Sequence, residues 1–159
     1  MTMKQKIIIC LSWITVISTM LMIFALSMQN AQTSSETSKS QIEVILNAII
    51  GKENVTEELV ASFQVPMRKL AHFGVYMLLG FCLTNAFNVS FKLKFVFISI
   101  FCGIAYSFFD EFFIQNISAG RGPSIIDVLI DSSGVAIGFG LYFLVLLINK
   151  KIPNKKQQA

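Results

Sequence analysis

The sequence predicts an all-α, polytopic membrane protein: a four-helix transmembrane bundle with a short extracytoplasmic helical segment. Hydrophobic residues make up 54% of the 159-residue chain and charged residues only 14%, whereas soluble domains carry about 25% charged residues. The apolar residues form long runs, and most charged residues fall near the ends of these runs or between them. Four runs are long enough to cross a bilayer core of about 30 Å, which takes about 20 helical residues. This pattern excludes a disordered chain and an ordinary soluble domain.

The four apolar runs are the predicted transmembrane helices, in a single domain that covers residues 1–159. They lie at about residues 7–28, 70–89, 95–114 and 125–148. The first run could instead be a cleaved signal peptide, because Lys4 and Lys6 precede it and Ala25-Leu26-Ser27 has the small-x-small pattern of a cleavage site. Its apolar run is longer than the roughly 7–15 residues usual in signal peptides. We therefore expect it to stay as a membrane anchor.

Residues 29–68 form the predicted extracytoplasmic segment between the first two spans. It begins with a polar linker, NAQTSSETSKS at residues 30–40, which holds too little apolar surface to fold and should be mobile. Beyond the linker, apolar residues recur with helical spacing: Ile42, Ile45, Leu46 and Ile49, then Val55, Leu59 and Phe63. This spacing predicts two short amphipathic helices interrupted at Gly51. We expect them to lie on the outer membrane surface and to pack against the helix ends as a lid.

Basic residues set the predicted orientation, because cytoplasmic loops carry an excess of Lys and Arg. One side would hold Lys4, Lys6, Lys92, Lys94, Lys150, Lys151, Lys155 and Lys156. The other side would hold Lys39, Lys52, Arg68, Lys69 and Arg121. No acidic residue falls on the more basic side. The prediction is a multi-pass protein of the plasma membrane with its N- and C-termini in the cytoplasm.

Polar side chains gather near the outer ends of the last three predicted spans. A charge at mid-membrane costs about 2.5–3.5 kcal/mol, so each of them needs a partner or a purpose. They are Arg68, Lys69, His72 and Tyr76; Tyr106, Asp110, Glu111 and Gln115; Arg121; and Ser124, Asp127 and Asp131. Many are i, i+4 neighbours, so each helix offers one polar stripe. We expect the stripes to converge on a polar, partly hydrated cavity that opens to the outside, with Asp131 as its deepest member.

Purely structural roles are the alternatives for several of these residues. An S-x-x-D capping box at the start of the last span would make Asp127 only a helix cap. Arg68 and Lys69 are alternatively interface residues that extend their charges toward water. His72 is alternatively a hydrogen-bonded packing residue and Tyr76 an interface aromatic.

Other features of the sequence indicate packing rather than chemistry. Gly134 and Gly138 predict a close approach of another helix. Cys10, Cys82 and Cys102 fall inside apolar runs without C-x-x-C spacing, as small hydrophobic residues do. The net charge of +4 comes with no basic stripe of interleaved aromatic residues, so we expect no nucleic-acid binding.

The ordered polar motifs resemble those of VanZ-like membrane proteins. The segment Arg68-Lys69-Leu70-Ala71-His72-Phe73, with Tyr76, Leu79 and Gly80, is similar to the family's K-x-x-H-F-x-x-Y-x-x-L-G signature. Asp110-Glu111, Gln115, Gly120-Arg121, Ser124, Asp127, Asp131, Gly134 and Gly138 resemble its D-E-x-x-Q, G-R, S-x-x-D and D/N-x-x-G-x-x-x-G elements, in the same order. Ser27-x-Gln29 resembles the segment after the family's first helix, so the resemblance covers about residues 27–138. Two departures are Asp131, where the family commonly has Asn, and Ser118-Ala119, where Pro is frequent.

The resemblance implies a small protein of the bacterial cell envelope. The founding member of the family is linked to low-level resistance to the glycopeptide teicoplanin, without a change in the terminus of the peptidoglycan precursor. The resemblance does not supply a biochemical mechanism, so the function has to be inferred from the predicted cavity.

The favoured hypothesis is a non-enzymatic binding module for the head group of a membrane lipid or a lipid-linked cell-wall precursor. Arg68, Lys69 and Arg121 would bind phosphate, and His72, Tyr76 and Gln115 would supply directional hydrogen bonds. Asp110, Glu111, Asp127 and Asp131 would hold the cations in place or bind a divalent cation, with no other cofactor expected. Occupying such a lipid would reduce the access of a membrane-anchored glycopeptide such as teicoplanin.

Two other functions use the same residues. The main alternative is an intramembrane enzyme, a phosphatase, hydrolase or transferase that acts on a polyprenyl phosphate or another envelope lipid, with His72 as base or nucleophile. Against it, the sequence lacks a nucleophile elbow, an H-E-x-x-H motif and a P-loop. A transporter or channel fits least, because the inner halves of the predicted helices offer no path of acidic residues or His.

Overall fold

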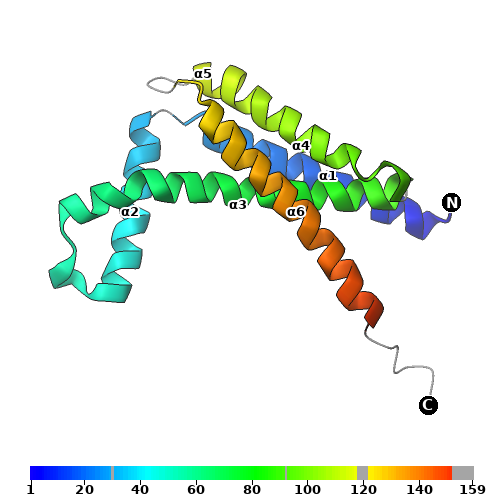
Figure 1. Cartoon of the computed structure of the whole chain (residues 1–159), viewed down its shortest axis with the longest axis horizontal. Helices are drawn as coiled ribbons and strands as arrows, with labels where there is room; N and C mark the ends of the chain where they lie inside the picture. Colours follow the sequence, from blue (N-terminus) through cyan, green and yellow to red (C-terminus); the bar gives the residue numbers. More distant parts are fainter. Residues whose placement is uncertain (30, 92, 118–121, 152–159) are drawn as a thin grey trace, which may run out of the picture.

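The structure, a computed structural model, describes residues 1–29, 31–91, 93–117 and 122–151, and every regular element in these ranges is helical. The elements are α1 (Met3–Ser27), α2 (Ala31–Ile50), the short 3-10 helix η1 (Lys52–Asn54), α3 (Glu57–Phe91), the short 3-10 helix η2 (Leu93–Phe95), α4 (Ile98–Phe109), the π-helical turn η3 (Asp110–Ile114), α5 (Gln115–Ile117) and α6 (Ile125–Lys151). The all-α prediction is confirmed. Figure 1 shows α3 running through the length of the molecule, with α1, α4 and α6 beside it.

The contact between α3 and α6 is the most extensive between any two elements of the described chain. Glycines make it close: a methyl group added to Gly134 would lie 2.5 Å from the Phe73 carbonyl oxygen, and one added to Gly138 would overlap the Met77 carbonyl. On α3, a methyl group at Gly80 would overlap the backbone of α6 in the same way. The predicted close packing at Gly134 and Gly138 is therefore confirmed, and it fixes α3 and α6 in register.

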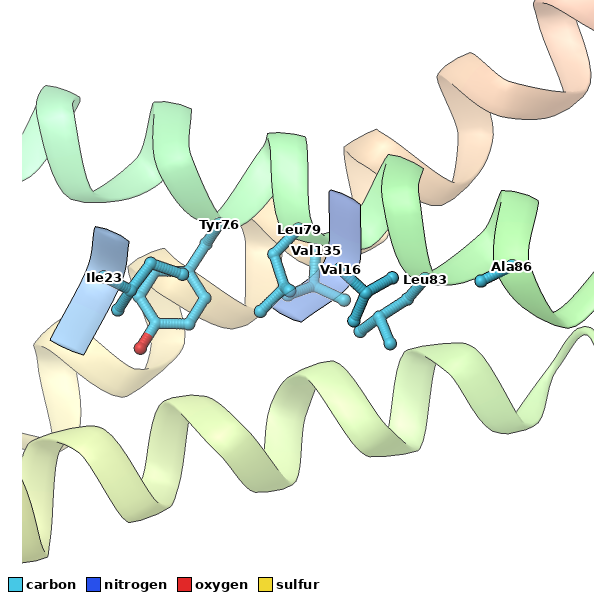
Figure 2. Close-up of a cluster of buried hydrophobic side chains, with 7 residues drawn as sticks. All are labelled: Val16, Ile23, Tyr76, Leu79, Leu83, Ala86 and Val135. Atoms are coloured by element: carbon cyan, nitrogen blue, oxygen red, sulfur yellow. The ribbon is translucent and has the colours of Figure 1, made fainter. Parts of the chain in front are cut away.

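The core of the bundle lies where α3 meets α1 and α6. Figure 2 shows its buried members: Val16 and Ile23 from α1, Tyr76, Leu79, Leu83 and Ala86 from α3, and Val135 from α6. Trp13, Phe87 and Tyr106 pack against this cluster from its edges. Side chains from three helices thus fill one continuous interior.

The surface of the bundle is more apolar than parts of its interior. On α1 the buried stripe includes Ser12, Thr19 and Ser27, whereas Leu11 and Ile17 on the outer side are 57% and 55% exposed. Such an arrangement is costly in water and is expected in lipid, where small and polar residues favour helix contacts. Within the described residues α1, α3 and α6 are long and apolar enough to cross a membrane. These candidate spans indicate a multi-pass membrane protein.

The predicted span at residues 95–114 differs from the other three. Its residues are divided over the end of η2, the 12-residue helix α4 and the π-helical turn η3. Helical structure nevertheless continues without a break from Ile98 to Ile117. At 1.5 Å per residue this stretch is about 30 Å long.

Polar side chains tie the helices together away from the predicted site. Asn85 on α3 donates to Ser12 on α1 at 3.0 Å, and the indole of Trp13 donates to Ser90 at 3.0 Å. Asn88 likewise donates to the Tyr142 hydroxyl on α6 at 2.8 Å. Because these groups satisfy one another, they are explained by helix association.

The mobile linker predicted at residues 30–40 is wrong, because α2 begins at Ala31 and runs to Ile50. The prediction relied on the low apolar content of this stretch. In the structure, side chains one turn apart are hydrogen-bonded along the helix: the Ser38 hydroxyl donates to the Ser34 carbonyl at 2.8 Å, and the Gln32 amide donates to Glu36 at 3.2 Å. Ser34 and Ile42 are also buried in the fold. Tertiary packing outweighs the modest helix propensity of Ser and Thr here.

The break at Gly51 is confirmed, since its φ of +81° is a conformation that L side chains rarely adopt. The second of the two predicted short helices does not end before the next span. Glu57 begins α3, and this helix continues through Pro66 to Phe91. The helix start predicted near residue 70 was therefore wrong: it was placed where the apolar run begins, whereas the helix includes the more polar residues before that run.

Candidate functional site

Four helical elements, α3, η3, α5 and α6, bring polar side chains to one end of the bundle, where α4 ends and α6 begins (Figure 1). One wall comes from the middle of α3, with Arg68, Lys69, His72 and Tyr76. The other walls come from Asp127 and Asp131 on α6 and from Asp110, Glu111 and Gln115 on η3 and α5. The i, i+4 spacing on α3 and α6 keeps each set on one helix face, and the glycine-mediated contact holds the two faces opposite each other.

Within the site, an ion pair between Lys69 Nζ and Asp127 Oδ1 at 2.9 Å joins α3 to α6. Both side chains are partly exposed. The Ser124 hydroxyl accepts a hydrogen bond from the Asp127 amide at 3.3 Å and so caps α6. Asp127 therefore lies at a helix start, as the capping motif predicts, but its carboxylate pairs with Lys69. The Ser124 amide donates instead to Glu111 Oε1 at 2.9 Å.

A buried group of hydrogen bonds surrounds the π-helical turn. Asp110 Oδ2 accepts from the Ser27 hydroxyl at 2.7 Å and from the Gln115 side-chain amide at 3.4 Å. The same amide nitrogen donates to Glu111. In the backbone, the Gln115 N–H donates to the Asp110 carbonyl, five residues back. The turn thus places the Gln115 amide beside both carboxylates. The bond from Ser27 to Asp110 also joins the end of α1 to η3.

Asp131 is the least satisfied member of the site. Its side chain is 0% exposed, and neither of its oxygens has a hydrogen-bond partner among the described residues. The nearest charged partner is His72, whose Nδ1 lies 3.8 Å from Asp131 Oδ1, which is too long for a good hydrogen bond. A buried carboxylate without donors is expensive, so this position favours a ligand-binding role over a purely structural one.

Tyr76 belongs both to the core and to this site. Its ring is fully buried in the cluster of Figure 2. Its hydroxyl lies near Asp110, yet it makes no hydrogen bond of good geometry with any described residue, and neither does Asp110 Oδ1. Tyr106, in contrast, donates to the Met20 carbonyl at 2.8 Å and so helps to hold α4 against α1.

Two cavities adjoin these residues, one on each side of the α3 stripe. The larger has a volume of about 230 Å³ and lies between the end of α1, α2 and α3. It is lined by Ile23, Leu26, Gln29, Ser34, Thr37, Ser38, Gln41, Met67, Arg68, Ala71, His72 and Val75. The smaller is a crevice of about 20 Å³ between α3, α5 and α6, lined by Arg68, Lys69, His72, Gln115, Asp127, Ile130 and Asp131. The first combines apolar and hydroxyl groups, and the second is mainly polar.

Arg68 and His72 line both cavities. Arg68 also lines a third cavity of about 70 Å³, next to Ser34, Ser38 and Gln64. Its guanidinium group makes no ion pair with a described residue. A half-buried cation that borders three cavities is well placed to bind an anionic group.

Most of the predicted site residues therefore lie close together, although their binding roles stay predictions. Arg121 lies outside the described residues. Among the described residues no group of three or more His, Cys, Asp or Glu side chains could hold a metal ion. The predicted site residues did not include Ser27 or the wall that α2 contributes with Ser34, Thr37, Ser38 and Gln41. Their helical spacing was the available signal, but their polarity was attributed to a linker.

Comparison with known proteins gives one match. The family model VanZ/LLP1 matches residues 12–147, a range that contains every side chain of the site described above. No curated protein and no solved structure matches the chain significantly.

Proposed function

The chain belongs to the VanZ/LLP1 family, and from this premise we propose that it binds the phosphate-bearing head group of a membrane lipid or lipid-linked precursor of the bacterial cell envelope. The head group would lie at the junction of the cavities, with its phosphate on Arg68. The observation that carries the proposal is this unpaired arginine, which borders the larger cavity, the polar crevice and the third cavity. Arginine suits a phosphate because its planar fork donates two parallel hydrogen bonds.

The larger cavity supports a lipid as the ligand. Ile23, Leu26, Met67 and Val75 give it an apolar wall, and Ser34, Thr37 and Ser38 give it hydroxyl groups on the side of α2. Binding sites for small molecules commonly combine an apolar lining with a few polar groups that fix orientation. The first methylene groups of a lipid chain would contact the apolar wall while the head group reaches Arg68.

The proposal includes a fourth membrane crossing by the helical stretch from Ile98 to Ile117. Its length of about 30 Å matches a bilayer core, and in Figure 1 it runs beside the C-terminal part of α3 up to the start of α6. Four crossings place the start of α1 and the end of α6 on the same side, which the excess of lysine there assigns to the cytoplasm. The site then faces the outside, where teicoplanin acts, and occupying or hiding a precursor lipid there would lower teicoplanin susceptibility.

The test is native mass spectrometry of the protein in nanodiscs, with a polyprenyl diphosphate as the probe. We expect an adduct of unchanged ligand mass, at least tenfold weaker in Arg68→Ala because charge-assisted hydrogen bonds to phosphate are lost. Lys52→Ala is the matched control, since Lys52 is an exposed cation in η1 that borders neither cavity of the site. Equal binding by the wild type and Arg68→Ala would contradict the proposal.

A second candidate function rests on the 3.8 Å approach of His72 to Asp131. A carboxylate beside an imidazole orients it and stabilises its protonated form, as a general base requires. In the same experiment, an enzyme would release a ligand that is lighter by phosphate, and His72→Ala would stop this change while bound substrate persists. An unchanged ligand mass with the wild-type protein would reject catalysis and leave the binding proposal standing.

A further inference from the structure

The polar crevice between α3 and α6 contains three polar side chains that make no side-chain hydrogen bond to a described residue, although two of them, His72 and Asp131, approach each other to 3.8 Å. Lys69 and Asp127 are paired with each other, and the Gln115 amide is engaged by Asp110 and Glu111. Arg68, His72 and Asp131 are the remaining polar members of the lining. Counted among its described residues, the crevice therefore presents one cation without an ion pair, and an imidazole and a carboxylate that approach each other only to 3.8 Å.

Arg68 and Asp131 carry opposite charges and line the same crevice, yet they do not form an ion pair. The crevice that both residues line has a volume of about 20 Å³, enough for one water-sized group. Both Asp131 oxygens lack a donor among the described residues, and the side chain has no contact with solvent. A ligand in the crevice would therefore need two groups side by side: a hydrogen-bond donor for Asp131 and an acceptor for Arg68.

We infer that the crevice between Arg68 and Asp131 selects head groups that carry a hydroxyl or N–H donor next to the phosphate. Resting on the proposed function, this inference names the class of ligand: phosphate on Arg68 and donor on Asp131. A glycerol hydroxyl, a sugar hydroxyl and a primary ammonium all meet the requirement. A quaternary trimethylammonium group does not, because it has no hydrogen to donate and is much larger than one water molecule.

The arrangement also explains why the donor has to arrive with the phosphate. An ammonium ion alone would be repelled by Arg68, and a phosphate alone would leave Asp131 without a partner and would approach a negative charge. A head group that carries both satisfies the two residues at once, which is how a site with opposite fixed charges discriminates between ligands. His72, which lines both cavities, lies one helical turn after Arg68 on α3 and 3.8 Å from Asp131 on α6.

The inference is tested by native mass spectrometry of the full chain in detergent with equal amounts of four probes. Phosphatidylethanolamine offers an ammonium donor and phosphatidylglycerol offers hydroxyl donors, whereas phosphatidylcholine offers none. A sugar-bearing polyprenyl diphosphate offers hydroxyl donors on a different anchor. We expect the three donor-bearing lipids to bind at least tenfold more tightly than phosphatidylcholine, the ratio typical of one hydrogen bond to a charged group.

Two substitutions separate recognition by Asp131 from exclusion by size. Asp131→Leu removes the acceptor and should bring all four probes to within about twofold of one another. Asp131→Asn keeps one acceptor oxygen, so it should reduce the preference for phosphatidylethanolamine and retain part of the preference for hydroxyl donors. Glu58→Gln is the matched control, because it neutralises an exposed carboxylate of α3 that borders neither cavity of the site; it should keep the wild-type ranking. Far-UV circular dichroism confirms that each variant is folded.

The outcomes distinguish the inference from the function on which it rests. If phosphatidylcholine binds the wild type as tightly as the donor-bearing lipids while Arg68→Ala weakens all of them, the inference is overturned and phosphate binding stands. If the ranking persists in Asp131→Leu, exclusion by size explains it and the inference is overturned. If Arg68→Ala weakens none of the probes, the proposed function itself fails. A preference limited to the sugar-bearing probe or to one phospholipid supports the inference and identifies the source of the donor.

Discussion

Replacing Gly138 with Ala tests the contact that holds the two sides of the site in register. A methyl group at this position would overlap the Met77 carbonyl and lie 2.8 Å from the Phe81 nitrogen. Both are backbone atoms of α3, so they cannot turn aside as a flexible side chain would, and α3 and α6 have to separate. Forcing an extra carbon into a tight interior costs about 1–3 kcal/mol.

Gly140→Ala is the matched control for this prediction. It makes the same chemical change two residues later on α6, where nothing lies within 4 Å of the added methyl group. The gain in helix propensity from Gly to Ala, up to about 1 kcal/mol, applies to both variants and cancels in the comparison. We expect Gly138→Ala to be less stable than Gly140→Ala by about 1–3 kcal/mol.

The assay is reversible unfolding in mixed micelles of increasing dodecyl sulfate content, followed by far-UV circular dichroism. Separation of the helices should also weaken ligand binding in Gly138→Ala, because Lys69 and Asp127 meet across the same interface at 2.9 Å. Equal free energies of unfolding for the two alanine variants would show that α6 does not approach α3 as closely as described.

Four further predictions use similar measurements. Ser27→Ala should lower the free energy of unfolding by about 1–3 kcal/mol because the buried Asp110 loses its 2.7 Å donor; Ser133→Ala, at an exposed serine that bonds only its own helix, should change it little. Lys69→Ala should cost less than about 1 kcal/mol, since the ion pair is partly exposed, and a larger loss would mean that the pair is better shielded than it looks. Asp131→Asn should keep or raise stability, because it removes a buried charge without donors; a clear loss would show that the charge is compensated. With the native cysteines replaced, Gly122→Cys should react with a membrane-impermeant maleimide on intact cells and Lys94→Cys should not; the reverse pattern would invert the proposed orientation.

The sequence predicted the parts of the site that follow from regular helix periodicity. Arg68 and His72, and likewise Asp127 and Asp131, are one turn apart, so any straight helix puts each pair on one face. The cost of charge in lipid then indicates that these faces turn toward each other. Gly134 and Gly138 could be predicted as a contact for the same reason, since small residues one turn apart let a helix backbone approach.

Other parts depend on contacts between segments that local patterns do not reveal. The N-terminal part of α2 has few apolar residues, and the helix contains a hydrogen bond from the Ser38 hydroxyl to the Ser34 carbonyl and packs against α3. The engagement of Ser27 with Asp110 joins residues 83 positions apart. The π-helical turn brings the Gln115 amide to the carboxylates of Asp110 and Glu111. No periodic pattern in the sequence indicates this turn.

The π-helical turn also changes how this part of the chain tolerates changes in length. Three residues separate Glu111 from Gln115, one more than in the D-E-x-x-Q element that this stretch resembles. In an unbroken α-helix, Gln115 would lie about 140° around the axis from Asp110, whereas here it donates to that carboxylate. The turn therefore absorbs one surplus residue. A one-residue deletion between Phe112 and Ile114 should be accommodated as ordinary α-helix, whereas a further insertion would carry Gln115 out of phase with both acids.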